Sequence, residues 1–295
     1  MSVLRVENLK KTYRRHRTQI QALKGINFKI EAGTVTGFLG ANGAGKTTTI
    51  KCLLELAYAD EGQIFYFEKQ GLSNEVKSRI GFLPERPYFY EYLTGQEFLR
   101  FYGEISTRLS RRDLQQRIQD LLKRVGLESA SDRQLRSYSK GMLQRVGIAQ
   151  ALIHDPEFVI LDEPMTGLDP DGRYEVREII RETAARGTAV FFSSHLLPDA
   201  EQSCDHLVIL KLGELIYQGP TETLLSQTSS QFEIVWQEDA SLKSELVRSA
   251  QDLQKRIDEL RKKSLTIIEV KPTRLTLEEA FVKIAFDRKA ERCAQ

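Results

Sequence analysis

The sequence predicts an α/β protein built around a mainly parallel β-sheet. Three observations support this prediction: a glycine-rich loop joins a short strand to a helix within 35–56, apolar strands alternate with helices over 157–218, and apolar residues fall at helical spacing over 94–153. A helical insertion is therefore expected within the α/β domain, with right-handed crossovers between the parallel strands.

The glycine-rich loop fits the pattern G-x-x-x-x-G-K-[ST], in which glycines let the backbone curl around an anion. The apolar run Val35 to Leu39 precedes it, and Thr47 to Leu56 follows with a helical rhythm. Loop N–H groups and the helix dipole would hold phosphate oxygens, with Lys46 on the β- and γ-phosphates and the Thr47 hydroxyl on Mg²⁺. The sequence thus predicts a nucleoside triphosphate site formed by Gly40, Asn42, Gly43, Ala44, Gly45, Lys46, Thr47 and Thr48.

Length, charge and cysteine content limit the classes of protein. The chain has 295 residues and a formal net charge of +2, which gives no electrostatic reason to expect nucleic acid as a partner. No apolar stretch approaches the roughly 20 residues that cross a bilayer, and the N-terminus lacks a signal peptide's apolar core. Cysteines stand at three scattered positions without metal spacing, Cys52, Cys204 and Cys293, and this odd number suggests a reducing compartment. Together with the missing apolar stretches, this leads us to expect a soluble cytoplasmic chain.

Two alternating strands are predicted before the loop, at Val3 to Val6 and at Ile26 to Ile30. The basic cluster between them, Lys10 to Arg17, is expected to be a solvated loop tip, although contact with nucleotide phosphates or lipid headgroups is the alternative. Tyr13 in this cluster is an aromatic residue that could stack on a base.

Two further strands, at 64–67 and 79–83, precede the helical insertion. Pro84 and Pro87 end the second of them and leave Glu85 in a loop. Three helices are then predicted from apolar residues at helical spacing. The first contains Phe98, Phe101 and Tyr102, the second contains Leu114, Ile118, Leu121 and Val125, and the third contains Met142, Val146, Ala149 and Ile153. Gly126 ends the second helix, and Ser139 caps the third.

Polar residues follow the ends of two buried strands. The apolar run Glu157 to Glu163 ends in two carboxylates, and Thr188 to Phe192 is followed by Ser193, Ser194 and His195. Ligands sit at the carboxyl ends of strands in open α/β sheets.

Three of these polar residues, Asp162, Glu163 and His195, are candidates for chemistry on the γ-phosphate. Asp162 is the expected acidic partner of Mg²⁺, and Glu163 is a candidate general base. His195 could hydrogen-bond the γ-phosphate, whereas His154 and His206 are expected to be structural. The alternative for the two carboxylates is a helix-start turn at the surface.

The chain after Pro220 changes in character. A hairpin turned at Gly213 closes the first domain, which we place at 1–220 with a helical subdomain at about 88–154, and a linker is expected at 221–230. The remaining 231–295 would form a small α+β domain with strands at 232–236 and 265–270 and a last helix from Thr276. Between the strands, an amphipathic helix is predicted from Leu242, Leu246, Ala250, Leu253, Ile257 and Leu260.

The motifs together resemble one family. The signature motif of ABC-family ATPases is similar to Tyr138-Ser139-Lys140-Gly141-Met142-Leu143-Gln144-Arg145, which lies between the phosphate loop and the acidic strand as it does in that family. Further family motifs match in order at Leu161-Asp162-Glu163-Pro164, at Gly167-Leu168-Asp169-Pro170 and at His195, the switch histidine. Tyr13 falls at the adenine-stacking aromatic. The resemblance covers roughly 1–220 and implies a P-loop NTPase core with an antiparallel β N-terminal subdomain, an α-helical signature subdomain, and ATP with Mg²⁺ as ligands.

Two positions depart from the commonest family pattern. The signature has Tyr-Ser-Lys-Gly-Met in place of Leu-Ser-Gly-Gly-Gln, and Glu85 stands where a Mg²⁺-contacting Gln is usual. Both variants, and the segment Leu277 to Phe281, resemble the export-type branch that includes antibiotic-efflux ATPases. Glu85 can still ligate Mg²⁺, but its charge beside Asp162 and Glu163 prevents a simple transfer of the Gln's role.

The resemblance implies ATP hydrolysis by a head-to-tail homodimer that encloses two ATP molecules, with Lys46, Glu163 and His195 as catalytic residues. The partner's signature helix would close each site through Ser139 and the Gly141 N–H.

In the same family mechanism, Asp169 would shape the dimer interface and align Glu163. Closure and release would drive a separately encoded permease, which would hold the chain on the inner face of the cell membrane. The aromatic segment Tyr88 to Tyr92 would contact that permease or, alternatively, pack the helical insertion.

The first hypothesis is therefore the ATPase subunit of an ABC exporter. The alternative is a non-transport ABC ATPase that acts on ribosomes or nucleic acid, but the sequence contains none of the second cassette, coiled-coil insertion or metal site usual in such chains. An importer subunit is disfavoured by the signature and Glu85 variants. The appendage would stabilise the dimer or regulate it, and the permease would select the cargo.

Overall fold

The computed structural model describes residues 2–15, 18–227, 231–238, 241–247, 249–273 and 276–282. The chain divides into two compact units, Met1–Gln218 and Gly219–Gln295. The first unit contains two sheets and several helices, and the second has a three-stranded sheet with a hydrophobic core of its own.

The N-terminal sheet is antiparallel, with the strand order β2-β1-β4-β5. Its strands are β1 (Ser2–Arg15), β2 (Thr18–Glu31), β4 (Glu61–Tyr66) and β5 (Lys69–Gln70). Towards its end β2 alternates buried and exposed residues, because one face of the strand lies on the core and the other meets water. The antiparallel N-terminal subdomain is thereby confirmed.

The basic segment 10–17 is not the loop tip that the sequence predicts. β1 continues to Arg15 and pairs with β2, so that Lys10 lies opposite Lys24 and Arg15 lies opposite Thr18. A two-stranded ribbon in solvent needs no alternation of apolar and polar residues. The alternating pattern that predicts a strand therefore ends earlier in the sequence than strand β1 itself. His16 and Arg17 lie outside the described residues.

The second sheet has six strands in the order β10-β9-β3-β8-β7-β6, and the pairs among β9, β3, β8, β7 and β6 are parallel. This confirms the mainly parallel sheet. The strands are β3 (Val35–Leu39), β6 (Ile80–Leu83), β7 (Phe158–Leu161), β8 (Ala189–Ser194), β9 (His206–Lys211) and β10 (Glu214–Pro220). Phe28, Phe38 and Phe191 pack between the two sheets, with ring centroids 5.0 to 6.0 Å apart.

Helices connect the parallel strands. α1 (Lys46–Leu53) follows β3, α6 (Pro170–Ala185) joins β7 to β8, and α7 (Leu197–Ser203) joins β8 to β9. The short α2 (Asn74–Lys77) precedes β6. Because β3, β7 and β8 are parallel, their carboxyl ends meet at one edge of the sheet, where the phosphate loop and the acidic residues lie.

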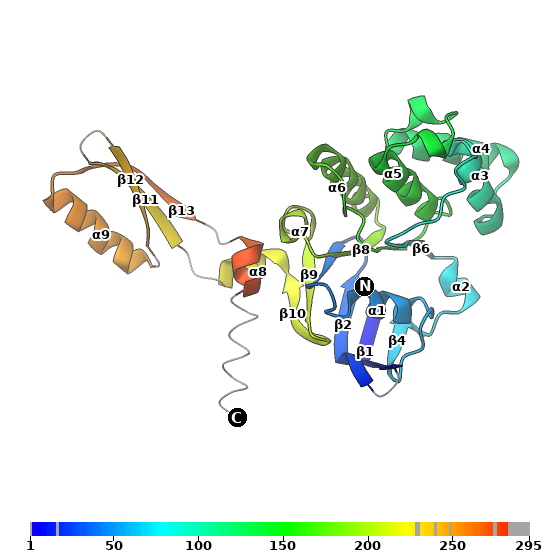
Figure 1. Cartoon of the computed structure of the whole chain (residues 1–295), viewed down its shortest axis with the longest axis horizontal. Helices are drawn as coiled ribbons and strands as arrows, with labels where there is room; N and C mark the ends of the chain where they lie inside the picture. Colours follow the sequence, from blue (N-terminus) through cyan, green and yellow to red (C-terminus); the bar gives the residue numbers. More distant parts are fainter. Residues whose placement is uncertain are drawn as a thin grey trace. The chain divides into compact units, whose positions relative to one another are not determined.

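The helical insertion is confirmed. Its helices are α3 (Gly95–Ser106), α4 (Arg111–Arg124) and α5 (Lys140–Ala151), with two short 3₁₀ turns between α4 and α5. Thr94, Ser110 and Ser139 cap them by accepting hydrogen bonds from backbone N–H groups in the first turn. Figure 1 shows these helices gathered at one end of the first unit and β1, β2 and β4 at the other.

The second unit is a small α+β structure. The strands β11 (Gln231–Glu238), β12 (Ser241–Val247) and β13 (Thr266–Thr273) form an antiparallel sheet in the order β12-β11-β13. Helix α9 (Ala250–Lys262) covers one face, with Leu260 buried against Ile234, Trp236 and Val247. Residues 277–282 are also helical.

The structure differs from the sequence-based expectation at two places in this unit. The segment 221–227, expected to be part of a linker, is helix α8 (Thr221–Gln227), and the remaining 228–230 lie outside the described residues. The amphipathic helix begins only at Ala250, and Leu242 and Leu246 lie on strand β12. A spacing of four residues places side chains on one face of either a helix or a strand, so these two leucines do not distinguish the alternatives. None of the helices in the described ranges is long and apolar enough to span a membrane.

Candidate functional site

The phosphate loop lies between the end of β3 and the start of α1, and its geometry requires glycine. A Cβ at Gly40 would lie 2.6 Å from the Leu210 carbonyl oxygen. Gly45 is the N-cap of α1 with φ of 113°, and Gly43 has φ of 80°, both in the left-handed region. The loop therefore presents backbone N–H groups at a helix N-terminus, as an anion site needs.

The side chains of the phosphate loop differ in exposure. Lys46 is buried, with 6% of its surface exposed, and its Nζ donates to the Gly40 carbonyl at 2.7 Å. Ala44 is also buried, whereas Asn42 and Thr47 are exposed. Thr47 is thus exposed beside the loop, where its hydroxyl could reach a metal ion on a bound phosphate.

Asp162 follows β7 directly and is buried. It accepts a hydrogen bond from the Ser193 hydroxyl at 2.6 Å. Burial raises the pKa of the Asp162 carboxyl, and the neighbouring charges of Glu85 and Glu163 raise it further, against the opposing effects of Ser193 and Lys46. A positive charge placed beside Asp162 would therefore stabilise the ionised form of its carboxyl.

Glu163 lies at the centre of a polar cluster. Its carboxylate accepts hydrogen bonds from the Thr166 hydroxyl and from His195 Nδ1, both at 2.8 Å, and lies 3.3 Å from Lys46 Nζ. Burial acts to raise the pKa of Glu163, but the Thr166 hydrogen bond and the charges of Lys46 and His195 outweigh it and lower the pKa. Glu163 is therefore ionised at neutral pH and able to accept a proton.

Glu85 and Tyr13 are two further exposed members of the predicted site. Glu85 follows β6, and its charge contributes to the raised pKa of Asp162. Tyr13 lies on β1, and the Lys11 ammonium is 5.6 Å from its ring centroid.

The signature residues lie at two other helix starts. Ser139 is exposed at the N-cap of α5, and its hydroxyl accepts from the Met142 N–H at 3.2 Å. Asp169 is exposed at the N-cap of α6 and accepts from the Gly172 N–H at 2.9 Å. Within the described residues, the side-chain hydrogen bonds of both remain inside their own caps, separate from the Glu163 cluster. Gly141 lies in the first turn of α5.

Two hydroxyl residues of the site are absent from the sequence-based prediction. Thr166 binds the Glu163 carboxylate, and Ser193 binds both Asp162 and the Glu163 N–H. The position of Ser193 at the end of a buried strand, two residues before His195, is a signal that could have identified it.

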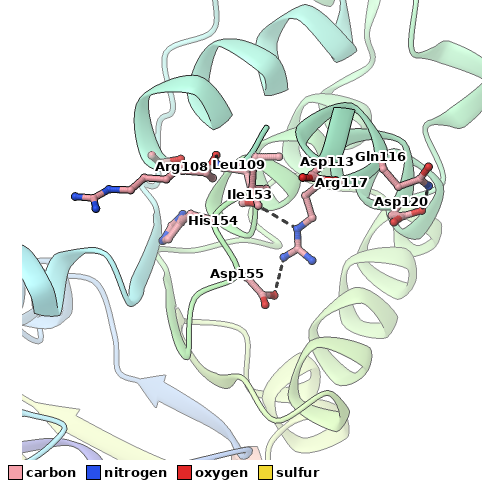
Figure 2. A pocket seen from close by; sticks show the side chains of 11 residues that line it. Arg108, Leu109, Asp113, Gln116, Arg117, Asp120, Ile153, His154 and Asp155 are labelled. Carbon is pink, nitrogen blue, oxygen red and sulfur yellow. Dashed lines mark hydrogen bonds and ion pairs between the residues drawn. The ribbon is translucent and has the colours of Figure 1, made fainter. Parts of the chain in front are cut away.

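A pocket of about 630 Å³ lies in the helical insertion and contains none of the predicted site residues. It is bordered by the connection between α3 and α4, by α4 and by 153–155. Figure 2 shows Arg117 turned toward the Asp155 carboxylate and the Ile153 carbonyl. At the same place His154 Nε2 lies 3.1 Å from the Ile80 carbonyl, consistent with the structural role expected for this histidine.

Comparison with known proteins identifies the family. The sequence model of the family described as ABC transporter matches residues 23–166. An uncharacterized ABC transporter ATP-binding protein of Synechocystis is 40% identical over 280 residues, which cover 90% of this chain and 78% of the relative. The bacitracin transport ATP-binding protein BcrA of Bacillus licheniformis is 41% identical, over 68% of this chain and 65% of its own length.

A solved structure, described as the ATP binding subunit of an ABC transporter, aligns with a TM-score of 0.67 and 32% identity. The alignment covers 76% of this chain and 92% of the other. A phosphate loop with its lysine, two carboxylates and a histidine at one sheet edge define a P-loop ATPase. The chain belongs to the ABC transporter family, in which it is an ATP-binding and ATP-hydrolysing cassette.

Proposed function

We propose that this cassette powers export through a separately encoded membrane permease, and that it works as a head-to-tail homodimer that closes over two ATP molecules. The observation that carries the proposal is the Glu163 carboxylate, which lies between the Lys46 ammonium and the His195 imidazole. Export is supported by the similarity to BcrA of two organisms, which is named as a bacitracin transport ATP-binding protein.

The proposed reaction is attack of water on the γ-phosphorus of ATP. Glu163, whose pKa is lowered, accepts the proton of the attacking water as the new P–O bond forms and the bond to the ADP oxygen breaks. Lys46 and the loop N–H groups stabilise negative charge on the phosphate oxygens, and His195 holds the Glu163 carboxylate in place. The products are ADP and inorganic phosphate.

Thr47, Asp162 and Glu85 offer the oxygen ligands that suit Mg²⁺. The buried Asp162, with its raised pKa, fits a divalent cation because the cation would favour the ionised carboxylate. Over the described ranges, no three or more His, Cys, Asp or Glu side chains gather as a metal cluster, which agrees with a site completed by phosphate oxygens and water. Bound Mg²⁺ would neutralise charge on the β- and γ-phosphate oxygens.

The exposed starts of α5 and α6 support the homodimer. Ser139 and Asp169 face solvent at these N-caps, and the Gly141 N–H is in the first turn of α5. In a two-fold dimer, the α5 N-terminus of one chain can donate to the γ-phosphate on the other. ATP then holds the two chains together, and hydrolysis removes the phosphate that joins them.

An aromatic patch of Tyr88, Tyr90, Tyr92 and Phe101 supports contact with the permease. Tyr88 is 80% exposed, although its ring packs 5.7 Å from Tyr90, which in turn packs 5.5 Å from Phe101. Exposed aromatic residues that are held in place by one another are typical of protein interfaces. Through this patch the permease would hold the chain on the inner face of the cell membrane.

The proposal is tested by capture of the partner. Tagged Glu163→Gln protein is expressed in its native host, membranes are solubilised in mild detergent with ATP present, and the captured proteins are identified by mass spectrometry. We expect a stoichiometric protein with several membrane-spanning helices. Ribosomal proteins or nucleic acid in its place, with the ATPase absent from membranes, would contradict the transport function.

A matched pair of variants tests the patch itself. In the same capture, Tyr88→Ser is expected to reduce recovery of the permease, whereas Tyr58→Ser, which changes a tyrosine of 81% exposure outside the patch, is expected to retain it. Equal recovery with both variants would remove the patch from the permease contact.

A further inference from the structure

Ser193 joins the two acidic residues of the site. This serine on β8 has 0% of its surface exposed, and its hydroxyl donates to Asp162 Oδ1 at 2.6 Å. The same oxygen accepts a hydrogen bond from the Glu163 N–H at 2.8 Å. A single hydroxyl thus acts as donor to one carboxylate and as acceptor for the backbone of the next residue.

The sheet register places Ser193 where it can reach both residues. Strand β8 lies between β3, which leads into the phosphate loop, and β7, which leads into Asp162. Phe192 pairs with Leu161 on β7, and Ser193 pairs with Phe38 on β3. Ser193 therefore lies beside Asp162 at the point where β7 ends.

The local backbone requires a fixed partner at this point. Glu163 has φ of 52°, in the left-handed region that side chains larger than glycine rarely adopt. Such a conformation persists where the surrounding structure holds it, and the Ser193 hydroxyl holds the Glu163 N–H. In this conformation the Glu163 carboxylate reaches Lys46 and His195.

We propose that Ser193 is a positioning residue that fixes the Asp162 carboxylate and the Glu163 backbone relative to each other. The inference rests on the proposed roles of Asp162 at Mg²⁺ and of Glu163 as general base. Ser193 holds the metal-binding group and the proton acceptor as one unit, so that the two act on the same γ-phosphate. Because its side chain is fully buried, Ser193 would act through these two residues and not by direct contact with the nucleotide.

The test compares neighbouring serines on β8. Ser193→Ala removes both hydrogen bonds, and we expect kcat for ATP hydrolysis to fall about tenfold or more, as for other residues that orient metal ligands. Ser193→Thr retains a hydroxyl and should restore most of the rate. The control is Ser194→Ala, because among the described residues the buried Ser194 hydroxyl bonds only to the Leu196 backbone; its rate should stay within about twofold of the unchanged protein.

A second readout does not depend on turnover. The serine variants are combined with Glu163→Gln, and ATP affinity is measured by calorimetry with Mg²⁺ and with EDTA. We expect Ser193→Ala to weaken binding of Mg²⁺-ATP about tenfold and to leave binding of ATP in EDTA within about twofold. A general loss of structure would weaken both equally.

The outcomes separate the inference from the proposed function. A Ser193→Ala enzyme with an unchanged kcat, or with equal losses of affinity in Mg²⁺ and in EDTA, would overturn the positioning role alone. Unchanged hydrolysis by the Glu163→Gln single variant would instead remove Glu163 as the general base. Thermal melting establishes that each variant is folded, and Ser193→Cys, which carries a weaker donor on a slightly larger side chain, replaces the alanine variant if that one does not fold.

Discussion

At the scale of single residues, the charged side chains of the site either stabilise or destabilise the ionised forms of their neighbours. Glu163 is stabilised as a carboxylate by Lys46, His195 and Thr166, whereas Asp162 is buried beside two other carboxylates. The first arrangement keeps Glu163 ionised, which is the form that a proton acceptor must have, and the second suits a carboxylate whose charge a bound cation would neutralise. The two adjacent acids are therefore adapted to different tasks by their surroundings.

This contrast predicts how Asp162→Asn affects stability. A raised pKa means that the folded protein binds a proton at Asp162 more readily than the unfolded chain does, so the fold loses stability as the pH rises through that interval. At pH 7.5 without nucleotide, Asp162→Asn removes the buried charge, and we expect a higher melting temperature than that of the unchanged protein. The difference should disappear below about pH 4, where the unfolded carboxyl is also protonated.

The measurement is thermal unfolding in EDTA over a series of pH values. Asp120→Asn, a change of the same chemistry at an exposed position on α4, is the control and should leave the melting temperature unchanged at every pH. A lower melting temperature for Asp162→Asn at pH 7.5 would show that hydrogen bonding to the charged form outweighs burial.

At the scale of elements, ion pairs between side chains join helices α6 and α7. Asp199 on α7 is buried and pairs with Arg177 at 3.2 Å and Arg173 at 3.7 Å, while Arg181 donates to the Gln202 carbonyl. The three arginines are spaced four residues apart and share one face of α6. Because α6 begins beside Asp169 and α7 begins beside His195, this contact fixes the two helices that leave the site.

Removing one partner of this cluster should be costly. Asp199→Ala leaves two arginines facing a buried position without their counter-ion, and we expect the free energy of unfolding to fall by about 3 kcal/mol. Urea denaturation measures the change. The control is Asp171→Ala, an exposed aspartate in the first turn of α6, for which we expect a loss below about 1 kcal/mol. Equal losses for the two variants would show that the cluster contributes no more than a surface charge.

The elements also show how far the sequence determines the fold. The phosphate loop, the parallel sheet and the helical insertion are predictable because each has a strong local pattern: glycines at fixed spacing, continuous apolar runs, and capping residues such as Ser139. The extended ribbon at 10–15 and strand β12 are not predictable in this way. The ribbon lacks an alternation of apolar and polar residues, and Leu242 and Leu246 on β12 fit both the helical and the strand period. The position of Ser193 at a strand end is a local signal, but its pairing with Asp162 depends on the register between β7 and β8, which no local pattern contains.

At the scale of the whole molecule, the proposed homodimer explains why the signature and the phosphate loop are separate. Ser139 is exposed and its side-chain hydrogen bond stays within the α5 cap, so it is available to a second chain. Two-fold symmetry would use the same pair of surfaces twice and would complete two sites together. ATP would then be part of the interface, and its hydrolysis would change the oligomeric state.

This arrangement predicts the effect of Ser139→Arg. In the Glu163→Gln background, which should bind ATP without hydrolysing it, Mg²⁺-ATP is expected to yield dimers by size-exclusion chromatography with light scattering. Ser139→Arg places a long side chain where the partner's phosphates would lie, so we expect monomers that retain ATP affinity within about threefold. In the otherwise unchanged protein, the same substitution should lower hydrolysis at least 100-fold, as for the loss of a group that acts on the transferred phosphate in trans.

The control must lose a helix N-cap in the same way as Ser139→Arg loses that of α5. Ser110 is also an exposed N-cap, since its hydroxyl accepts from the Asp113 N–H at the start of α4, and Ser110→Arg loses the same kind of cap and gains the same bulk. We expect Ser110→Arg to dimerise and hydrolyse ATP normally, because α4 is not part of the proposed interface. Dimers of the Ser139→Arg protein would contradict the sandwich, and failure of both variants would assign the effect to the lost cap.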